Sequence, residues 1–130
     1  MLPTILSTTV LILIFIIIYT VNEIPGSIFA IAIDTIPYGD KISHIGFYGL
    51  LTLTLNSAFQ LKTIPVLKQN VLLGSLGVVL FSSAEELSQY YFPGRTVDIL
   101  DLLCNYSGII LASYIVLWHE QWLKNPRTRA

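Results

Sequence analysis

The segment from Ile5 to Val21 constrains the fold of this chain most, because it is strongly apolar and contains no charged residue. As a helix it is nearly long enough to cross the ~30 Å hydrocarbon core of a bilayer. The whole chain agrees, since 54% of its 130 residues are hydrophobic and 12% are charged, whereas soluble domains average about 25% charged residues. One domain of this length cannot hide so much apolar surface from water. We therefore predict an integral membrane protein.

A secretory signal peptide is the competing interpretation of this first segment. Such a peptide has a basic N-terminal region and a cleavage site with small residues. The positions before Ile5 contain no lysine or arginine, and residues 20–27 (TVNEIPGS) contain no Ala-x-Ala pattern. We predict a retained transmembrane helix.

Further apolar segments and their boundary residues predict three more helices. The PYGD sequence (37–40) is a turn signal before the second helix. Pro65 suits the first turn of a third helix, and Thr96 is a candidate N-cap for the fourth. Residues 27–36 are apolar but too short to span, so we expect a re-entrant or interfacial stretch there. We predict one all-α, four-helix transmembrane domain over residues 1–130, with spans at about 4–22, 42–61, 66–91 and 97–122.

The lysines and arginines predict how this bundle is oriented. An even number of spans places both termini on one side, and cytoplasmic loops are enriched in Lys and Arg. Five basic residues fall on the side of the termini and two on the other: Lys62, Lys68, Lys124, Arg127 and Arg129 against Lys41 and Arg95. We expect a multi-pass plasma-membrane protein with cytoplasmic termini and its acidic motifs facing outward.

Polar residues form stripes at the predicted outer ends of three helices. On the second helix they have the spacing i, i+3, i+7, which places them on one helical face. The fourth helix repeats this spacing, and the third contributes an i, i+4 pair with Glu86 beside it. Arg95 lies in the turn between the third and fourth helices. The stripes are Lys41, His44 and Tyr48, preceded by Asp40; Glu85 and Gln89; and Asp98, Asp101 and Asn105.

These groups predict a polar, outward-facing pocket. An ionisable group in a membrane costs at least ~2.5–3.5 kcal/mol, so it faces the bundle interior or a wet cavity and finds a partner there. Arg95 presents a planar fork suited to phosphate or carboxylate. An interhelical ion-pair network that only fixes helix register is the alternative. The predicted pocket residues are Asp40, Lys41, His44, Tyr48, Glu85, Glu86, Gln89, Arg95, Asp98, Asp101 and Asn105.

Other classes of site receive less support. Glu86 and His44 are the candidates for a general base. A zinc site from His44 with acidic ligands is conceivable, but no H-x-x-x-H or H-E-x-x-H spacing supports it, and we expect no metal or cofactor. Cys104 is the only cysteine, so an intrachain disulfide is excluded. The net charge of −1 gives no reason to expect nucleic-acid binding.

The motifs resemble those of the VanZ-like membrane proteins. The family pattern D-K-x-x-H-x-x-x-Y is matched by Asp40, Lys41, His44 and Tyr48 in residues 37–51 (PYGDKISHIGFYGLL). In residues 85–111, E-x-x-Q falls on Glu86 and Gln89, P-G-R on residues 93–95, and D-x-x-x-N-x-x-G on Asp101, Asn105 and Gly108. Glu85 is also a candidate for the family's glutamate, although the spacing favours Glu86.

The resemblance implies a four-helix protein of the bacterial envelope, from a family whose namesake is associated with resistance to teicoplanin-type antibiotics. We expect a binding protein rather than an enzyme, one that engages membrane lipids and an anionic, lipid-linked cell-wall precursor or headgroup. Two alternatives remain open: a structural or accessory subunit of a larger membrane complex, and a membrane-embedded transferase or hydrolase with a carboxylate base.

Overall fold

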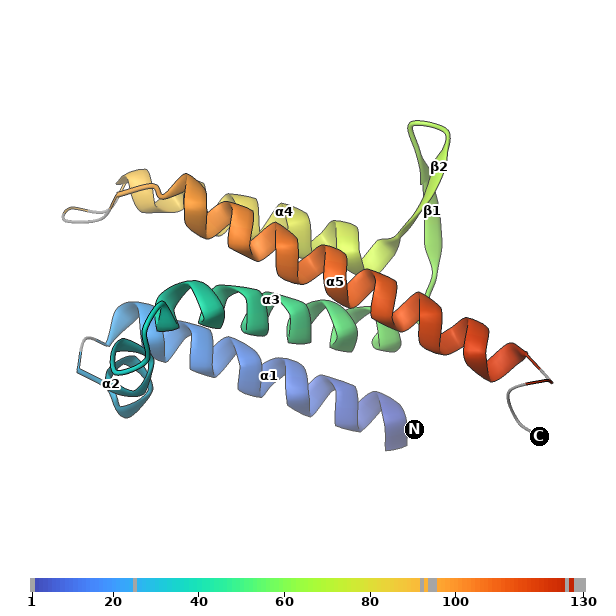
Figure 1. Cartoon of the computed structure of the whole chain (residues 1–130), viewed down its shortest axis with the longest axis horizontal. Coiled ribbons are helices and arrows are strands. Elements are labelled where there is room, and N and C mark those ends of the chain that lie inside the picture. Colours follow the sequence, from blue (N-terminus) through green and yellow to red (C-terminus); the bar gives the residue numbers. More distant parts are fainter. Residues whose placement is uncertain (1, 25, 92, 94–95, 126, 128–130) are drawn as a thin grey trace.

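The computed structural model describes the chain except for residues 1, 25, 92, 94–95, 126 and 128–130, and except for the side chains of residues 2–4, 18, 21 and 22. Its described part is mostly helical, as predicted (Figure 1). The elements are α1 (Leu2–Glu23), α2 (Ile28–Asp34), α3 (Gly39–Ala58), β1 (Thr63–Val66), β2 (Gln69–Leu72), α4 (Leu73–Ser88), the 3-10 helix η1 (Gln89–Tyr91) and α5 (Ile99–Lys124).

The four longer helices run lengthwise beside one another (Figure 1). Helix α3 occupies the middle of the bundle and contacts α1, α4 and α5. The β-hairpin, the start of α1 and the end of α5 lie at one end of the bundle. Helix α2, the start of α3, the end of α4 and the start of α5 lie at the other. This second end is called the polar end below.

The antiparallel hairpin of β1 and β2 replaces the first turns of the predicted third helix. Thr63 pairs with Leu72, and Val66 pairs with Gln69. The prediction that this helix starts near Pro65 was therefore wrong, because α4 begins at Leu73. The β-branched residues of 63–72 favour strands, and Pro65 is tolerated in a two-stranded sheet because each strand has an edge without a neighbour.

Asn56, near the end of α3, supplies the cap that α4 lacks locally. The N-cap residue Leu72 has no side chain that can accept a hydrogen bond. Instead, the backbone N–H of Ser75 donates to Asn56 Oδ1 at 3.1 Å, and Asn56 Nδ2 donates to Ser75 Oγ at 2.8 Å. The side chain of one helix thus satisfies an orphan N–H of another.

The helix starts differ from prediction in other places too. Asp98, not Thr96, caps α5, since its side chain accepts a hydrogen bond from Leu100 N at 2.8 Å. The N-cap of α3 is Tyr38, and Asp40 lies in the first turn of this helix. Ser27 caps α2, and this seven-residue helix is too short to span a membrane. Its membrane depth remains a prediction.

Helices α3 and α5 approach closely because glycines face each other at their contact. A Cβ placed on Gly108 would meet Ile45 O at 2.3 Å and Gly49 N at 3.1 Å. Beside this contact, Tyr48, Leu51, Val78 and Ile109 form a buried apolar core with Ile14 of α1.

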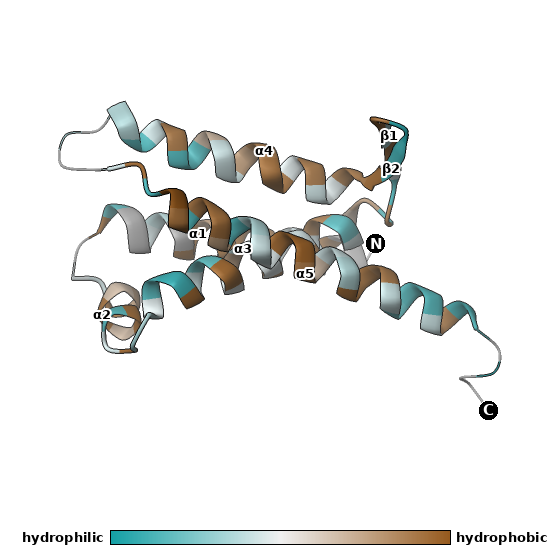
Figure 2. Ribbon diagram, turned by 45° about the horizontal axis from the view of Figure 1, so that its top comes forward, coloured by the Kyte–Doolittle hydropathy of each residue, from teal (hydrophilic) through white to brown (hydrophobic). Residues whose placement is uncertain are grey.

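The interior of the bundle is unusually polar and its exterior unusually apolar. The fully buried side chains include Asn56, Glu86 and Asn105, whereas large hydrophobic residues such as Ile16 and Leu80 are exposed. Figure 2 shows that hydrophobic residues recur along the long helices. Among the described residues, α5 alone is long and apolar enough to cross a membrane, and a shorter apolar helix runs from Ile5 to Ile17. The four-span topology and its orientation therefore remain predictions.

Candidate functional site

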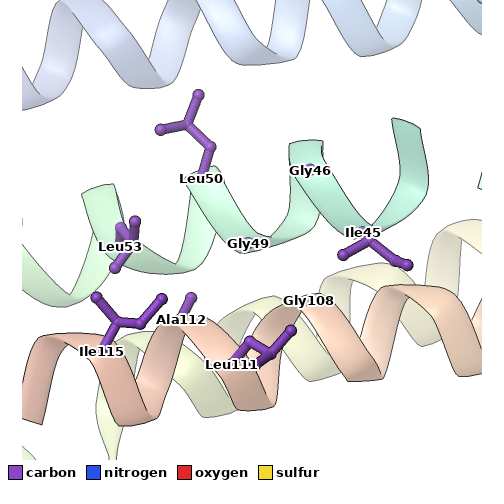
Figure 3. A pocket seen from close by; sticks show the side chains of 9 residues that line it. All are labelled: Ile45, Gly46, Gly49, Leu50, Leu53, Gly108, Leu111, Ala112 and Ile115. Atoms are coloured by element: carbon purple, nitrogen blue, oxygen red, sulfur yellow. The ribbon is translucent and has the colours of Figure 1, made fainter. Parts of the chain in front are cut away.

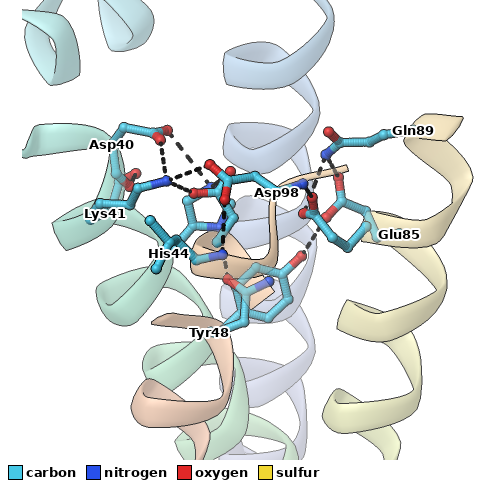
Figure 4. Close-up of polar contacts among 12 residues, drawn as sticks. Asp40, Lys41, His44, Tyr48, Glu85, Gln89 and Asp98 are labelled. Carbon is cyan, nitrogen blue, oxygen red and sulfur yellow. Dashed lines mark hydrogen bonds and ion pairs between the residues drawn. The ribbon is translucent and has the colours of Figure 1, made fainter. Parts of the chain in front are cut away.

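Polar residues from α3, α4, η1 and α5 meet at the polar end of the bundle (Figure 4). Hydrogen bonds and ion pairs join every predicted pocket residue that the structure describes, and Arg95 lies outside the described residues. We call this group the polar cluster: Asp40, Lys41, His44, Tyr48, Glu85, Glu86, Gln89, Asp98, Asp101 and Asn105.

Lys41 connects the start of α3 to the start of α5. Its Nζ donates a hydrogen bond to Asp98 Oδ2 at 3.0 Å and another to Asp101 Oδ1. Asp40 Oδ2 lies 3.6 Å from the same nitrogen. The ammonium is therefore surrounded by carboxylates from two helices.

His44 lies one turn after Asp40 and faces α5. Its Nδ1 is 2.7 Å from Asn105 Oδ1. Its Nε2 lies 3.7 Å from Asp40 Oδ1 and 3.7 Å from Asp101 Oδ2. Because an amide oxygen only accepts hydrogen bonds, Nδ1 carries the hydrogen, and a neutral ring then turns its Nε2 lone pair toward the two carboxylates.

Tyr48 connects α3 to α4 on the other side of the cluster. Its hydroxyl donates to Glu85 Oε2 at 3.0 Å. Gln89 Nε2 lies 3.5 Å from Glu85 Oε1 and 3.5 Å from Glu86 Oε2. The i, i+3 and i, i+4 spacings predicted from sequence thus place these side chains together on one helical face.

Glu86 is fully buried and joins α4 to the start of α5. Its Oε1 accepts a hydrogen bond from the backbone N–H of Asp98 at 2.8 Å. This contact positions Asp98, the N-cap residue of α5, whose side-chain carboxylate binds Lys41. As a candidate general base, Glu86 has no exposed surface in this conformation.

Asn105 is fully buried beneath His44. Its oxygen contacts the imidazole, but its Nδ2 has no hydrogen-bond partner in the part of the chain that the structure describes. A buried donor without an acceptor costs about 1–3 kcal/mol. Among the described residues, the base of the cluster therefore contains an N–H donor with no acceptor.

Three residues of the cluster have the geometry of a metal-ligand set. Asp40, His44 and Asp101 each offer one ligand atom, and these atoms all lie within 4.8 Å of one another. Sequence reasoning did not expect a metal here. A search for local ligand spacing cannot detect the set, because Asp101 comes from a different helix than Asp40 and His44.

Two surface grooves lined by described residues lie away from the cluster and are mostly apolar. One, of about 260 Å³, follows the contact between α3 and α5 around Gly49 and Gly108 (Figure 3). The other, of about 510 Å³, lies between the hairpin, α4 and α5. Neither is lined by a residue of the polar cluster. An open polar pocket therefore remains a prediction.

The family relationship rests on nearly the whole chain. The sequence profile of the VanZ/LLP1 family matches residues 4–120. The chain belongs to the VanZ/LLP1 family. Searches of curated proteins and of solved structures find no match. The resemblance drawn from the motifs is thus confirmed.

The VanZ/LLP1 motifs acquire a spatial meaning in this structure. The D-K-x-x-H-x-x-x-Y motif supplies the α3 side of the polar cluster, and D-x-x-x-N supplies the α5 side. The last glycine of that second motif, Gly108, allows α5 to approach Ile45 and Gly49 of α3. Of the P-G-R motif, Gly94 and Arg95 lie outside the described residues.

Proposed function

We propose that this VanZ/LLP1 protein crosses the plasma membrane four times and binds the anionic headgroup of a lipid-linked cell-envelope molecule at its polar cluster. Helices α1, α3, α4 and α5 are the proposed spans, with both termini in the cytoplasm. The apolar exterior and polar interior of the bundle support this topology, because a bilayer is the solvent that favours such a distribution. Helix α4 has 16 residues and extends ~24 Å, which is shorter than the ~30 Å hydrocarbon core. The proposed third span therefore consists of α4 together with η1.

The observation that carries the binding proposal is the meeting of charged, partly accessible side chains from three helices at one end. The exposed side-chain fractions are 62% for Asp40, 42% for Asp98 and 28% for Lys41. Ionisable groups of a membrane bundle mark functional sites by default. The carboxylates are suited to sugar hydroxyls or amines of a headgroup, and Lys41 and Arg95 are the proposed partners of its phosphate.

The binding test uses purified protein in nanodiscs and a polyprenyl phosphate as probe, with phosphatidylcholine as reference lipid. We expect Lys41→Ala and Arg95→Ala to weaken probe binding by about tenfold, the effect of losing one charge-assisted contact worth ~1.4 kcal/mol. Lys68→Ala is the matched control, because Lys68 is exposed at the hairpin tip, at the opposite end of the bundle. Equal affinities for all four proteins would refute headgroup binding.

The topology test compares two engineered cysteines in a Cys104→Ala background. Tyr38 is 83% exposed at the polar end, and Leu67 is 94% exposed at the hairpin tip. In intact cells, we expect a membrane-impermeant maleimide to label Tyr38→Cys and to label Leu67→Cys only after permeabilisation. The reverse pattern would place the polar cluster in the cytoplasm.

A purely structural role is the second candidate, and the contacts of Lys41 favour it. Both of its hydrogen bonds go to carboxylates around the start of α5, so the ammonium already joins α3 to α5. If the protein is an accessory subunit, the Lys41→Ala substitution would lower its stability and the amount of partner protein that co-purifies with it. The fraction of the variant that remains folded would bind the probe as well as the unaltered protein does. The nanodisc experiment therefore separates the two functions.

A further inference from the structure

We propose that Asp40, His44 and Asp101 form a binding site for one divalent transition-metal ion, Zn²⁺ or Mn²⁺. The site lies within the polar cluster and deepens the proposed function. The metal binding itself stands on the geometry of these three side chains, and its role in holding a headgroup rests on the proposed function.

The donor atoms converge without contacting one another. His44 Nε2 is 3.7 Å from an oxygen of Asp40 and 3.7 Å from an oxygen of Asp101. These separations exceed a hydrogen bond. They suit an ion bound between the atoms, since Zn–N and Zn–O bonds of ~2.0–2.2 Å place cis ligands roughly 3–3.7 Å apart.

The surroundings orient the donors toward this point. Asn105 Oδ1 accepts the Nδ1 hydrogen of His44, which leaves Nε2 as the metal-binding nitrogen. A hydrogen bond from the second ring nitrogen is the usual support of a metal-bound histidine. On the far side, Lys41 contacts Asp40 Oδ2 and Asp101 Oδ1. The opposite oxygens, Asp40 Oδ1 and Asp101 Oδ2, are the ones that face His44.

Asn105 supports the imidazole from the side opposite to the proposed metal ion. Asn105 is fully buried, and its Nδ2 has no partner among the described residues, although its oxygen contacts the site at His44. Asn105 lies on the Nδ1 side of the imidazole, so a buried water on that side would suit its unpartnered N–H. At Nε2, on the other side of the ring, three protein ligands leave coordination positions open for a water or phosphate oxygen.

The chemistry of the donors selects the ion. One imidazole and two carboxylates suit Zn²⁺ or Mn²⁺ better than Ca²⁺ or Mg²⁺, which prefer oxygen ligands alone. A bound cation would also offset the negative charge of the cluster. The described part of the polar cluster contains five carboxyl groups and one lysine, and three of the carboxyl groups contact that lysine. A divalent ion with open positions would bridge this acidic cluster to a phosphate.

Metal binding is tested on the full chain in detergent, after removal of metal with a chelator. Titration calorimetry with Zn²⁺ and electron paramagnetic resonance with Mn²⁺ measure affinity and stoichiometry. We expect one ion per chain. Asp40→Asn and His44→Gln should each weaken binding by more than the roughly 10–100-fold loss that second-shell substitutions cause.

The chain provides matched controls for both ligands. Asp34→Asn changes an exposed aspartate at the end of α2, and His119→Gln changes the other histidine, exposed near the end of α5. Both should bind metal like the unaltered chain. Asp40 is largely exposed, so Asp40→Asn keeps the test valid even if His44→Gln fails to fold.

Two outcomes would overturn the inference: no binding by the unaltered chain below about 1 mM, or equal binding by the unaltered chain, Asp40→Asn and His44→Gln, which indicates an adventitious ion. Repeating the nanodisc experiment with chelator separates this inference from the proposed function. If the probe binds but no metal site is found, only the inference of metal binding is refuted. If metal binds but the probe does not, only the proposal of headgroup binding is refuted.

Discussion

Lys41 Nζ, in the first turn of α3, donates a 3.0 Å hydrogen bond to Asp98 Oδ2, at the N-cap of α5. The backbone N–H of Asp98 in turn donates to the buried Glu86 of α4. Lys41, Asp98 and Glu86 therefore connect three helices at the polar end. In the middle of the bundle, Gly49 and Gly108 bring two of these helices together. Each connection leads to a measurable expectation.

Replacement of Lys41 by methionine should destabilise the protein. The substitution preserves much of the aliphatic chain but removes the ammonium, so Asp98 and Asp101 lose their partner and repel each other. We expect a loss of about 1–2 kcal/mol, seen as a lower thermal midpoint in detergent. Lys68→Met, at the exposed hairpin tip, should leave the midpoint unchanged. Equal midpoints for the two variants would contradict a stabilising role of Lys41.

Replacement of Gly108 by alanine should separate α3 from α5. The added Cβ would lie 2.3 Å from Ile45 O, a backbone atom that cannot move away without shifting the helix. We expect a loss of roughly 1–3 kcal/mol, the usual cost of overpacking. Gly46→Ala is the matched control on the facing helix, because its Cβ meets nothing within 4 Å. It should be neutral or stabilise by up to ~1 kcal/mol through helix propensity. Thermal unfolding of the two variants compares them directly, and a tolerated Gly108→Ala would refute the close approach.

Replacement of Asn56 by alanine should weaken the start of α4. The buried Ser75 N–H would lose its acceptor, and Ser75 Oγ would lose a donor. We expect a cost of about 1–3 kcal/mol in chemical denaturation. The control Asn70→Ala removes an exposed asparagine from β2 and should have little effect. Hydrogen exchange would locate the Asn56 effect, as faster exchange in the first turn of α4.

Glu86 should tolerate glutamine but not leucine. Glutamine retains the oxygen that accepts the Asp98 N–H at 2.8 Å and removes a buried acid, so we expect near-neutral stability. Leucine removes the acceptor and should cost about 1–3 kcal/mol. If the two variants unfold at the same midpoint, the hydrogen bond does not hold the start of α5. A protein with Glu86→Gln that folds normally but loses a measured enzymatic activity would instead favour the enzyme alternative.

Much of the polar cluster could be predicted because helical periodicity is a local property. The spacing of Lys41, His44 and Tyr48 places them on one face of any α-helix, and the same holds for Asp98, Asp101 and Asn105. The order of these motifs also sufficed to recognise the family, which the match over residues 4–120 confirms. What these residues bind stays a proposal.

The errors arose at helix starts, where contacts with another segment compete with the local preference of one residue. Pro65 suits a helix start, yet the strand pairing of 63–66 with 69–72 competes successfully for this segment. Helix α4 then begins where Asn56 of α3 can cap it. Thr96 is a good N-cap by type, but Asp98 is the residue that both Glu86 and Lys41 hold in place.

By itself, the sequence determined the family, the helical character and the helical faces on which the polar residues lie, because composition and periodicity act within one segment. Only the tertiary structure decided that Lys41 is held by carboxylates of another helix, that Asn105 supports His44, and that Asp40, His44 and Asp101 converge. The physical reason is that these arrangements depend on the depth and rotation of α5 against α3. Both are set by the close approach at Gly49 and Gly108, a contact between residues far apart in the chain.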